Sequence, residues 1–189
     1  MISKVIRLIL IIAICLTVSS WPNAHAESPP SREYPIKAAF LYNFAKFVDW
    51  PAEAFSNDST PLTLCILGED PFGDALKSIK GKTVRGRKLV IEHSAWPEDM
   101  GQCHILFVSA SEEKRLSRIL NTIRGKTILT VSDMNSFARR GGIINLVTLR
   151  SKIHFEINMD ATDLAGLKIS SKLLKLAKIV RDERREENY

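Results

Sequence analysis

Few residues of this 189-residue chain have the type and spacing to do chemistry. Cys65 and Cys103 lie in separate apolar runs, and the sequence contains no C-x-x-C pair of the thioredoxin type. Beyond residue 26 the histidines are His93, His104 and His154. None of them has a second His or Cys at ligand spacing, so we predict no metal site. His104 lies inside an apolar run and is interpreted as a hydrogen-bonded core or edge residue.

The segment Gly68–Gly73 (Gly-Glu-Asp-Pro-Phe-Gly) is a candidate ligand crevice. It lacks the Lys-Ser or Lys-Thr of a P-loop, but it follows a predicted strand and precedes a predicted helix. Such strand-to-helix connections form ligand crevices in open α/β sheets. The candidate crevice residues are Gly68, Asp70, Phe72 and Gly73. The alternative is a tight turn, which Glu69 and Asp70 favour because their carboxylates repel anions.

An enzyme is the weakest of the function classes considered. The sequence has no G-x-S-x-G nucleophile elbow. A catalytic thiol needs an exposed, electropositive setting, whereas Cys65 is flanked by Leu64 and Ile66. We therefore predict no catalytic residue and no cofactor.

The N-terminus predicts export. Lys4 and Arg7 precede the short apolar run Leu8–Val18, and Ala24-His25-Ala26 matches a signal-peptidase site. Residues 1–26 are therefore predicted to be a cleaved signal peptide, which places the protein in the periplasm. Its removal lowers the formal net charge from +6 to +4, which gives no reason to expect a nucleic-acid partner. Cys65 and Cys103 are then the remaining cysteines, and an oxidising compartment favours a disulfide between them over two buried thiols.

The pattern of apolar residues predicts an α/β fold: a mixed, mostly parallel sheet flanked by helices, with a closing β-hairpin and a long C-terminal helix. Residues 27–35 are predicted to be a flexible lead-in, and residues 36–189 a single domain. The expected strands are Leu62–Leu67, Leu89–Ile91, Cys103–Ser109, Thr127–Val131 and the hairpin Ile143–Leu149 with Ile153–Ile157. The expected helices are Ile36–Trp50, Pro71–Ile79, Ser111–Leu120, a short one from Ser132 to Phe137, and Met159–Val180.

The first and last predicted helices carry more apolar residues than one small sheet would need. Within Met159–Val180 the apolar residues Ile169, Leu173, Leu176 and Val180 follow one another at intervals of 4, 3 and 4 positions. They would form one stripe on a helix, with lysines beside it. The candidate interface residues are Phe40, Phe44, Phe47, Leu173, Leu174 and Lys175. Core packing is the alternative for both helices. Lys37 lies near the apolar arc of the first helix, so it is expected to pair with a carboxylate or lie at an edge.

Several runs together resemble the YfiR family of small periplasmic proteins from Gram-negative bacteria. They span about residues 36–180 in the family's order. They include Lys37-Ala-Ala-Phe-Leu-Tyr-Asn-Phe-Ala-Lys-Phe-Val-Asp-Trp-Pro51, Gly141-Gly-Ile-Ile-Asn-Leu146 and Gly166-Leu-Lys-Ile-Ser-Ser-Lys-Leu-Leu-Lys-Leu-Ala177. The best-understood members bind the periplasmic domain of a membrane-bound diguanylate cyclase and repress it, and their release promotes surface attachment and biofilm formation.

The resemblance implies a non-enzymatic periplasmic regulator that binds an inner-membrane signalling protein and represses cyclic di-GMP production. Such a protein would be peripheral to the membrane and could form a homodimer. The alternative is a small-ligand-binding module that serves a histidine kinase or receptor, using the Gly68–Gly73 crevice.

Overall fold

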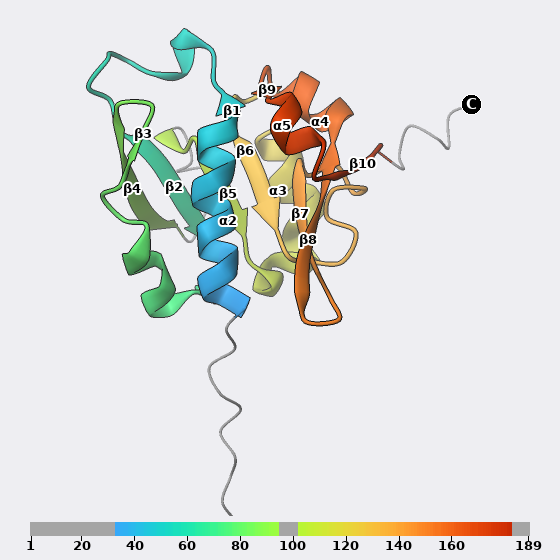
Figure 1. Cartoon of the computed structure of the whole chain (residues 1–189). Helices are drawn as coiled ribbons and strands as arrows, with labels where there is room; N and C mark the ends of the chain where they lie inside the picture. Colours follow the sequence, from blue (N-terminus) through green and yellow to red (C-terminus); the bar gives the residue numbers. More distant parts are fainter. Residues whose placement is uncertain (1–32, 95–101, 183–189) are drawn as a thin grey trace, which may run out of the picture. The chain divides into compact units, whose positions relative to one another are not determined.

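The computed structural model describes residues 33–94 and 102–182, which belong to one compact unit (Figure 1). The predicted signal peptide and most of the lead-in lie outside the described residues. The strands are β1 (Val48–Asp49), β2 (Leu62–Leu67), β3 (Thr83–Val84), β4 (Arg87–Ser94), β5 (Ile105–Val108), β6 (Leu129–Ser132), β7 (Ile144–Leu149), β8 (Lys152–Asn158), β9 (Lys168–Ile169) and β10 (Lys178–Val180). The α-helices are α2 (Glu33–Phe47), α3 (Leu116–Thr122), α4 (Met159–Leu164) and α5 (Ser171–Leu174).

Eight strands form a mixed sheet in the order β10-β8-β7-β6-β5-β2-β4-β3, and β1 pairs with β9 in a small separate sheet. Most neighbours in the large sheet are parallel; the β3–β4 and β7–β8 pairs are antiparallel. The predicted mixed, mostly parallel sheet and its closing hairpin are therefore confirmed.

The central strands β2, β5 and β6 are buried along their whole length and mostly apolar, because both faces of the sheet are covered. Leu64 and Ile66 of β2 pack into the cluster on the α2 side, whereas Cys65 and Leu67 pack into the cluster that contains α3. Figure 1 shows α2 lying across the front of the sheet, with α3 behind it. The result is a helix–sheet–helix arrangement.

Helix α2 is shifted toward the N-terminus relative to the prediction. It begins at Glu33 rather than Ile36, so the segment read as a flexible lead-in supplies its first turn. Pro35 is tolerated there because the first-turn N–H groups of a helix have no partner within it. The helix ends at Phe47, and β1 follows where the prediction continued the helix to Trp50.

The long C-terminal helix predicted from Met159 to Val180 is wrong. Helix α4 stops at Leu164, and Gly166 then adopts a φ of +67°, a left-handed conformation that favours glycine. The chain next pairs as β9 with β1, makes one turn as α5, and joins the sheet as β10, parallel to β8. Strand pairing has overridden a sequence pattern that is also typical of a helix.

The remaining helical predictions need smaller corrections. The segment Pro71–Ile79 contains a 3₁₀ helix at Gly73–Ser78. The predicted helix from Ser111 starts as a 3₁₀ helix, Ala110–Arg115, before α3. The short helix expected from Ser132 to Phe137 is a series of turns instead.

Candidate functional site

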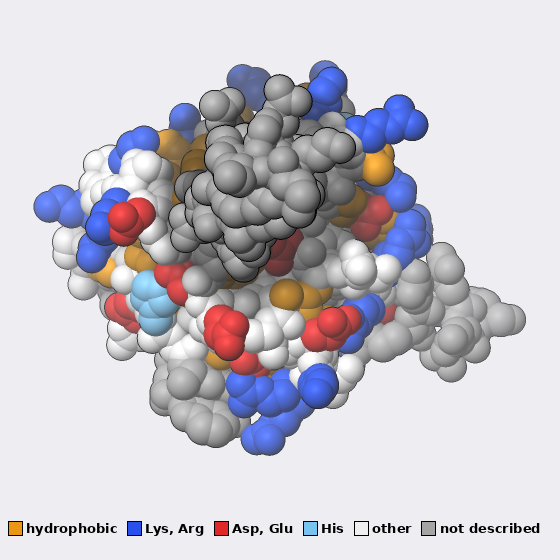
Figure 2. Space-filling model, turned by 90° about the horizontal axis from the view of Figure 1, so that it is seen from below, with side chains coloured by type: hydrophobic (Ala, Val, Ile, Leu, Met, Phe, Trp, Pro, Cys, Tyr) orange, Lys and Arg blue, Asp and Glu red, His pale blue; other side chains and the backbone are white. Residues whose placement is uncertain are grey.

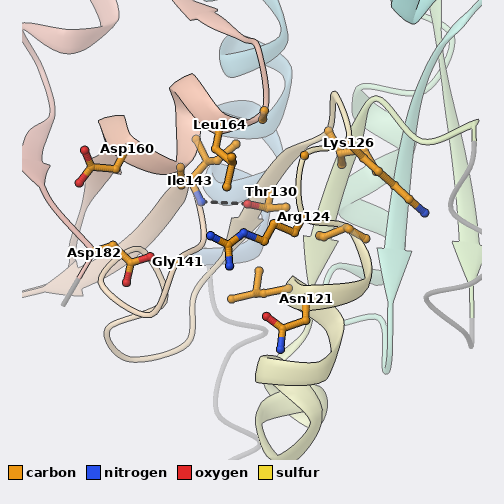
Figure 3. Close-up of a pocket in the computed structure, with 15 residues that line it drawn as sticks. Asn121, Arg124, Lys126, Thr130, Gly141, Ile143, Asp160, Leu164 and Asp182 are labelled. Atoms are coloured by element: carbon orange, nitrogen blue, oxygen red, sulfur yellow. Dashed lines mark hydrogen bonds between the residues drawn. The ribbon is translucent and has the colours of Figure 1, made fainter. Parts of the chain in front are cut away.

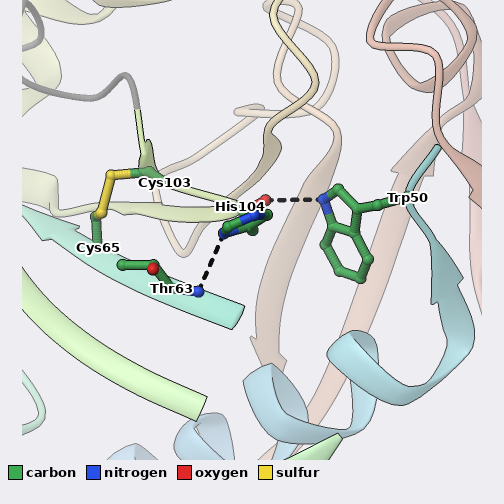
Figure 4. Close-up of a disulfide and its surroundings, with 5 residues drawn as sticks. All are labelled: Trp50, Thr63, Cys65, Cys103 and His104. Atoms are coloured by element: carbon green, nitrogen blue, oxygen red, sulfur yellow. Dashed lines mark hydrogen bonds between the residues drawn. A yellow bond between two sulfur atoms is a disulfide. The ribbon is translucent and has the colours of Figure 1, made fainter. Parts of the chain in front are cut away.

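The predicted cysteine pair lies at the junction of β2 and β5 (Figure 4). The sulfur atoms of Cys65 and Cys103 are at disulfide-bonding distance, and their Cα atoms are 5.8 Å apart. Both side chains are buried. A bonded sulfur offers no thiolate for nucleophilic attack, which argues against the thiol-enzyme alternative.

His104, next to Cys103, is a structural residue as predicted. The backbone N–H of Thr63 donates to its Nδ1 at 3.1 Å, so the proton lies on Nε2, which donates to the carbonyl of Ala54 at 3.0 Å. The ring stacks on Phe55 with a centroid distance of 4.4 Å. Burial lowers the pKa of His104, which keeps the ring neutral.

Trp50 ties the end of the β1 segment to the same place. Its indole Nε1 donates to the carbonyl oxygen of His104 at 3.2 Å (Figure 4). The region formed by Trp50, Thr63, Cys65, Cys103 and His104 is called the β2–β5 junction below. The cysteine pair and the hydrogen bonds of His104 and Trp50 hold neighbouring segments together. These side chains are therefore engaged in structural contacts and are not available for catalysis.

Lys37 of α2 is paired, as expected from its place near the apolar arc. Only 3% of the residue is exposed, and its Nζ lies 2.5 Å from carboxylate oxygens of both Glu33 and Asp133. The ammonium also lies 4.6 Å from the ring centroid of Tyr34. Burial alone would lower the pKa of Lys37, but hydrogen bonds to Asp133 and Glu33 raise it above its ordinary value. This ion pair anchors the start of α2 to the loop after β6.

The Gly68–Gly73 loop is closed by a neighbouring turn. Gly68 has a φ of +89°, and a Cβ placed there would lie 2.5 Å from Ser111 Oγ and 2.8 Å from Glu112 Cγ. Ser111 Oγ also accepts a hydrogen bond from the backbone N–H of Glu69 at 3.0 Å. The turn after β5 therefore fills the space that a ligand would need beside Gly68.

The other candidate crevice residues stabilise the loop itself. Asp70 Oδ1 accepts from the backbone N–H of Phe72 at 2.8 Å, and its Oδ2 lies 2.8 Å from His93 Nε2. Phe72 is buried against Phe107, and Gly73 begins the 3₁₀ helix. Acidic side chains are visible among basic ones at this end of the molecule, where α2 begins (Figure 2). The bonds made by Asp70 and the packing of Phe72 against Phe107 favour the interpretation of this loop as a tight turn.

The six candidate interface residues do not share one surface. Phe44 and Leu173 are buried in the core, which rules them out as exposed contacts in this conformation. Phe40, Phe47 and Leu174 are partly buried and pack against the same core cluster. Lys175 is exposed.

An exposed apolar surface lies next to Lys175 and was not singled out from the sequence. Leu176 is 75% exposed and Ile179, on β10, is 49% exposed. Strand β10 is the last in the sheet order, so among the described residues one side of its backbone has no strand partner. The segment from α5 to β10, residues 171–180, is called the C-terminal corner below.

A hollow of about 330 Å³ lies between the end of α3, the start of β6 and α4 (Figure 3). It is lined by aliphatic side chains, with Arg124, Lys126, Asp160 and Asp182 around them. A second, larger and more polar hollow of about 440 Å³ lies beside Lys37 and Asp133. Neither hollow includes the Gly68–Gly73 loop, and the sequence pattern gave no sign of either.

Two properties of the described part of the chain bear on function. Among residues 33–94 and 102–182, His, Cys, Asp and Glu side chains form no group of three suited to a metal ion. In the same residues, every helix is too short or too polar to cross a membrane.

Comparison with known families gives a direct match. A family model described as YfiR/HmsC-like matches residues 34–178, from the first turn of α2 to the first residue of β10. This chain belongs to the YfiR/HmsC-like family.

The fold is also similar to a solved structure, described as a conserved domain protein from Vibrio cholerae O1 biovar El Tor strain N16961. The TM-score is 0.53 at 12% sequence identity, and the match covers 77% of this chain. It covers 59% of the Vibrio chain, so the present protein corresponds to only part of that one. At this identity the likeness concerns the fold alone.

Proposed function

We propose that this protein binds the periplasmic domain of an inner-membrane diguanylate cyclase and represses its production of cyclic di-GMP. The observation that carries the proposal is the YfiR/HmsC-like match across residues 34–178. The disulfide-bonding distance between Cys65 and Cys103 is consistent with an oxidising compartment.

We place the receptor-binding surface at the C-terminal corner. Leu176 and Ile179 expose aliphatic side chains that contribute little to the core, and exposed apolar groups of this kind often mark protein interaction sites. Lys172 and Lys175 lie exposed beside them, which would favour a receptor surface with acidic groups around an apolar centre.

Repression in this proposal is a shift of population. A protein that binds the inactive conformer of a receptor more tightly than the active one favours the inactive conformer by the difference in binding free energy. A shift from 1% to 99% inactive receptor requires roughly a 10⁴-fold preference. A stress signal would then act by weakening this binding.

The test compares two exposed leucines in the native bacterium. Deletion of the gene should raise cellular cyclic di-GMP and surface attachment, and the wild-type gene should restore both. Leu176→Glu should fail to restore them, because it puts a charge in the proposed interface. Leu149→Glu is the matched control: Leu149 is also strongly exposed, but it lies at the end of β7 in the hairpin.

Purified variants must melt within a few degrees of the wild type for the comparison to count. Normal complementation by Leu176→Glu would reject the C-terminal corner as the receptor surface. An unchanged cyclic di-GMP level after gene deletion would reject the repressor function itself. Analytical ultracentrifugation of the wild type and Leu176→Glu shows whether the same corner also joins two copies of the chain.

A further inference from the structure

The hollow between α3, β6 and α4 has an apolar floor. Ile123, Ile128 and Ile143 are buried there, while Leu164 of α4 is 52% exposed at its edge. The volume of about 330 Å³ lies at the lower end of the range for small-molecule sites. A ligand with an apolar body would rest against this floor and remove the exposed Leu164 side chain from water.

Two hydrogen-bond donors reach the same hollow. The guanidinium of Arg124, just after α3, lies within it, whereas Lys126 extends away (Figure 3). Arg124 has no ion-pair partner among the described residues. Thr130 is buried beside it, and its Oγ1 accepts from the backbone N–H of Ile143 at 2.8 Å, so the hydroxyl hydrogen remains available to donate.

The opposite side of the hollow sets a limit on the ligand's charge. Asp160 and Asp182 lie there, and each already has an interaction partner of its own. Their carboxylates would repel a second anionic group. A ligand with one negative group on Arg124 meets less of this repulsion than a dianion would, so the lining suits a single negative charge.

We propose that this hollow binds a small amphipathic monoanion. A monocarboxylate with an aliphatic or aromatic body would place its carboxylate on Arg124 and the Thr130 hydroxyl, and its body on Ile123, Ile128 and Leu164. Arginine matches a carboxylate well because its planar fork can donate two parallel hydrogen bonds. This site is independent of the receptor surface proposed above, and its ligand can be tested on the purified protein alone.

The probe is decanoate, titrated calorimetrically into the purified full chain, with decanol as the uncharged comparison of equal chain length. Decanoate should bind with one-to-one stoichiometry and more tightly than decanol. Arg124→Gln should weaken decanoate binding by roughly tenfold or more, since a hydrogen bond to a charged group contributes on this scale, and should leave decanol binding unchanged. Lys114→Gln, which removes an exposed charge elsewhere, is the matched control.

Leu164→Asp supplies a second, independent variant. It changes an exposed residue, so the fold should survive, yet it should weaken both probes by placing a charge over the apolar floor. Equal binding of decanoate and decanol, or full decanoate binding by Arg124→Gln, would overturn the proposal. Absence of decanoate binding to the wild type at millimolar concentration would also overturn it. None of these outcomes depends on whether the protein represses a cyclase.

Discussion

The β2–β5 junction and the C-terminal corner are built in opposite ways. At the junction, a cysteine pair, a buried histidine and an indole N–H connect strands in the middle of the sheet. The corner contains a four-residue helix and a three-residue edge strand, and its most exposed large apolar side chain is Leu176.

This difference suggests that the β2–β5 junction contributes to folding stability and that the C-terminal corner contributes to binding of a partner. Cys65, Cys103 and His104 at the junction are buried and bonded to other parts of the domain, so changing them should cost folding free energy without altering a surface. Leu176 and Ile179 at the corner are exposed to water, so changing them should cost little folding free energy and act on partners instead. Changes at the two regions, taken from the largest to the smallest expected loss of unfolding free energy, test this division of roles.

Loss of the disulfide should have the largest effect. Cys65→Ser with Cys103→Ser opens a loop of 38 residues, which the chain-entropy estimate puts at about 4 kcal/mol of unfolding free energy. Urea unfolding with and without reductant measures this loss. Peptide mapping under non-reducing conditions is the control, and two alkylatable thiols in the native wild type would contradict the bond.

Lys37→Met should be nearly as costly. It leaves the carboxylates of Glu33 and Asp133 close together without their shared cation, and Asp133 is almost fully buried. We expect a loss of about 2–3 kcal/mol, below the upper range for buried pairs because Glu33 is partly solvated. The double variant Lys37→Met with Asp133→Asn should recover part of the loss. A single variant as stable as the wild type would show that the pair contributes nothing.

Acid should weaken the junction through His104. Burial lowers the pKa of His104 in the folded protein, with a nearby Arg87 cation acting in the same direction, so the unfolded chain takes up a proton that the native ring resists. The unfolding free energy should therefore fall as the pH drops below about 6.5, by at most about 1.4 kcal/mol per pH unit. Urea midpoints between pH 8 and pH 5 test this, and His104→Asn should show a shallower slope.

Leu176→Glu should have the smallest effect on folding, within about 0.5 kcal/mol of the wild type. The adjacent change Leu173→Glu places a carboxylate in the core and should cost several kcal/mol. Thermal melting of the two variants side by side provides the comparison. A strong loss of stability in Leu176→Glu would mean that the corner belongs to the folded core and not to an interaction surface.

Sequence patterns correctly predicted those parts of the fold in which the local pattern of apolar and turn residues agrees with the tertiary contacts. The apolar run Leu62–Leu67 is a buried central strand, and the turn Arg150-Ser151 joins the predicted hairpin. The cysteine pairing followed from the count and the expected compartment. The prediction of the closing helix failed because the spacing of Ile169, Leu173, Leu176 and Val180 fits a helix. In the structure Ile169 pairs with β1 and Val180 with β8, and no local pattern describes these pairings. Gly166 was the local signal that argued against one continuous helix.

The candidate site was less predictable than the fold. Whether Phe44 is a contact or a core residue depends on the sheet beneath it, which no local pattern describes. The order of a strand followed by a helix predicts a crevice at Gly68. In the folded chain Ser111, 43 positions later, lies against Gly68 and closes it. The hollow around Arg124 is likewise made by segments that meet only in the folded chain.

The anchoring of α2 also bears on how the chain folds. Lys37 bonds to Asp133, 96 positions later, and Glu33 bonds to Thr148, 115 positions later. During synthesis α2 is made before the strands it covers, so its packing is complete only after β8 and α5 have been made. Contacts of such long sequence separation slow folding and leave an apolar surface open to aggregation meanwhile. Helix α2 therefore reaches its full set of contacts only when nearly the whole domain has been made.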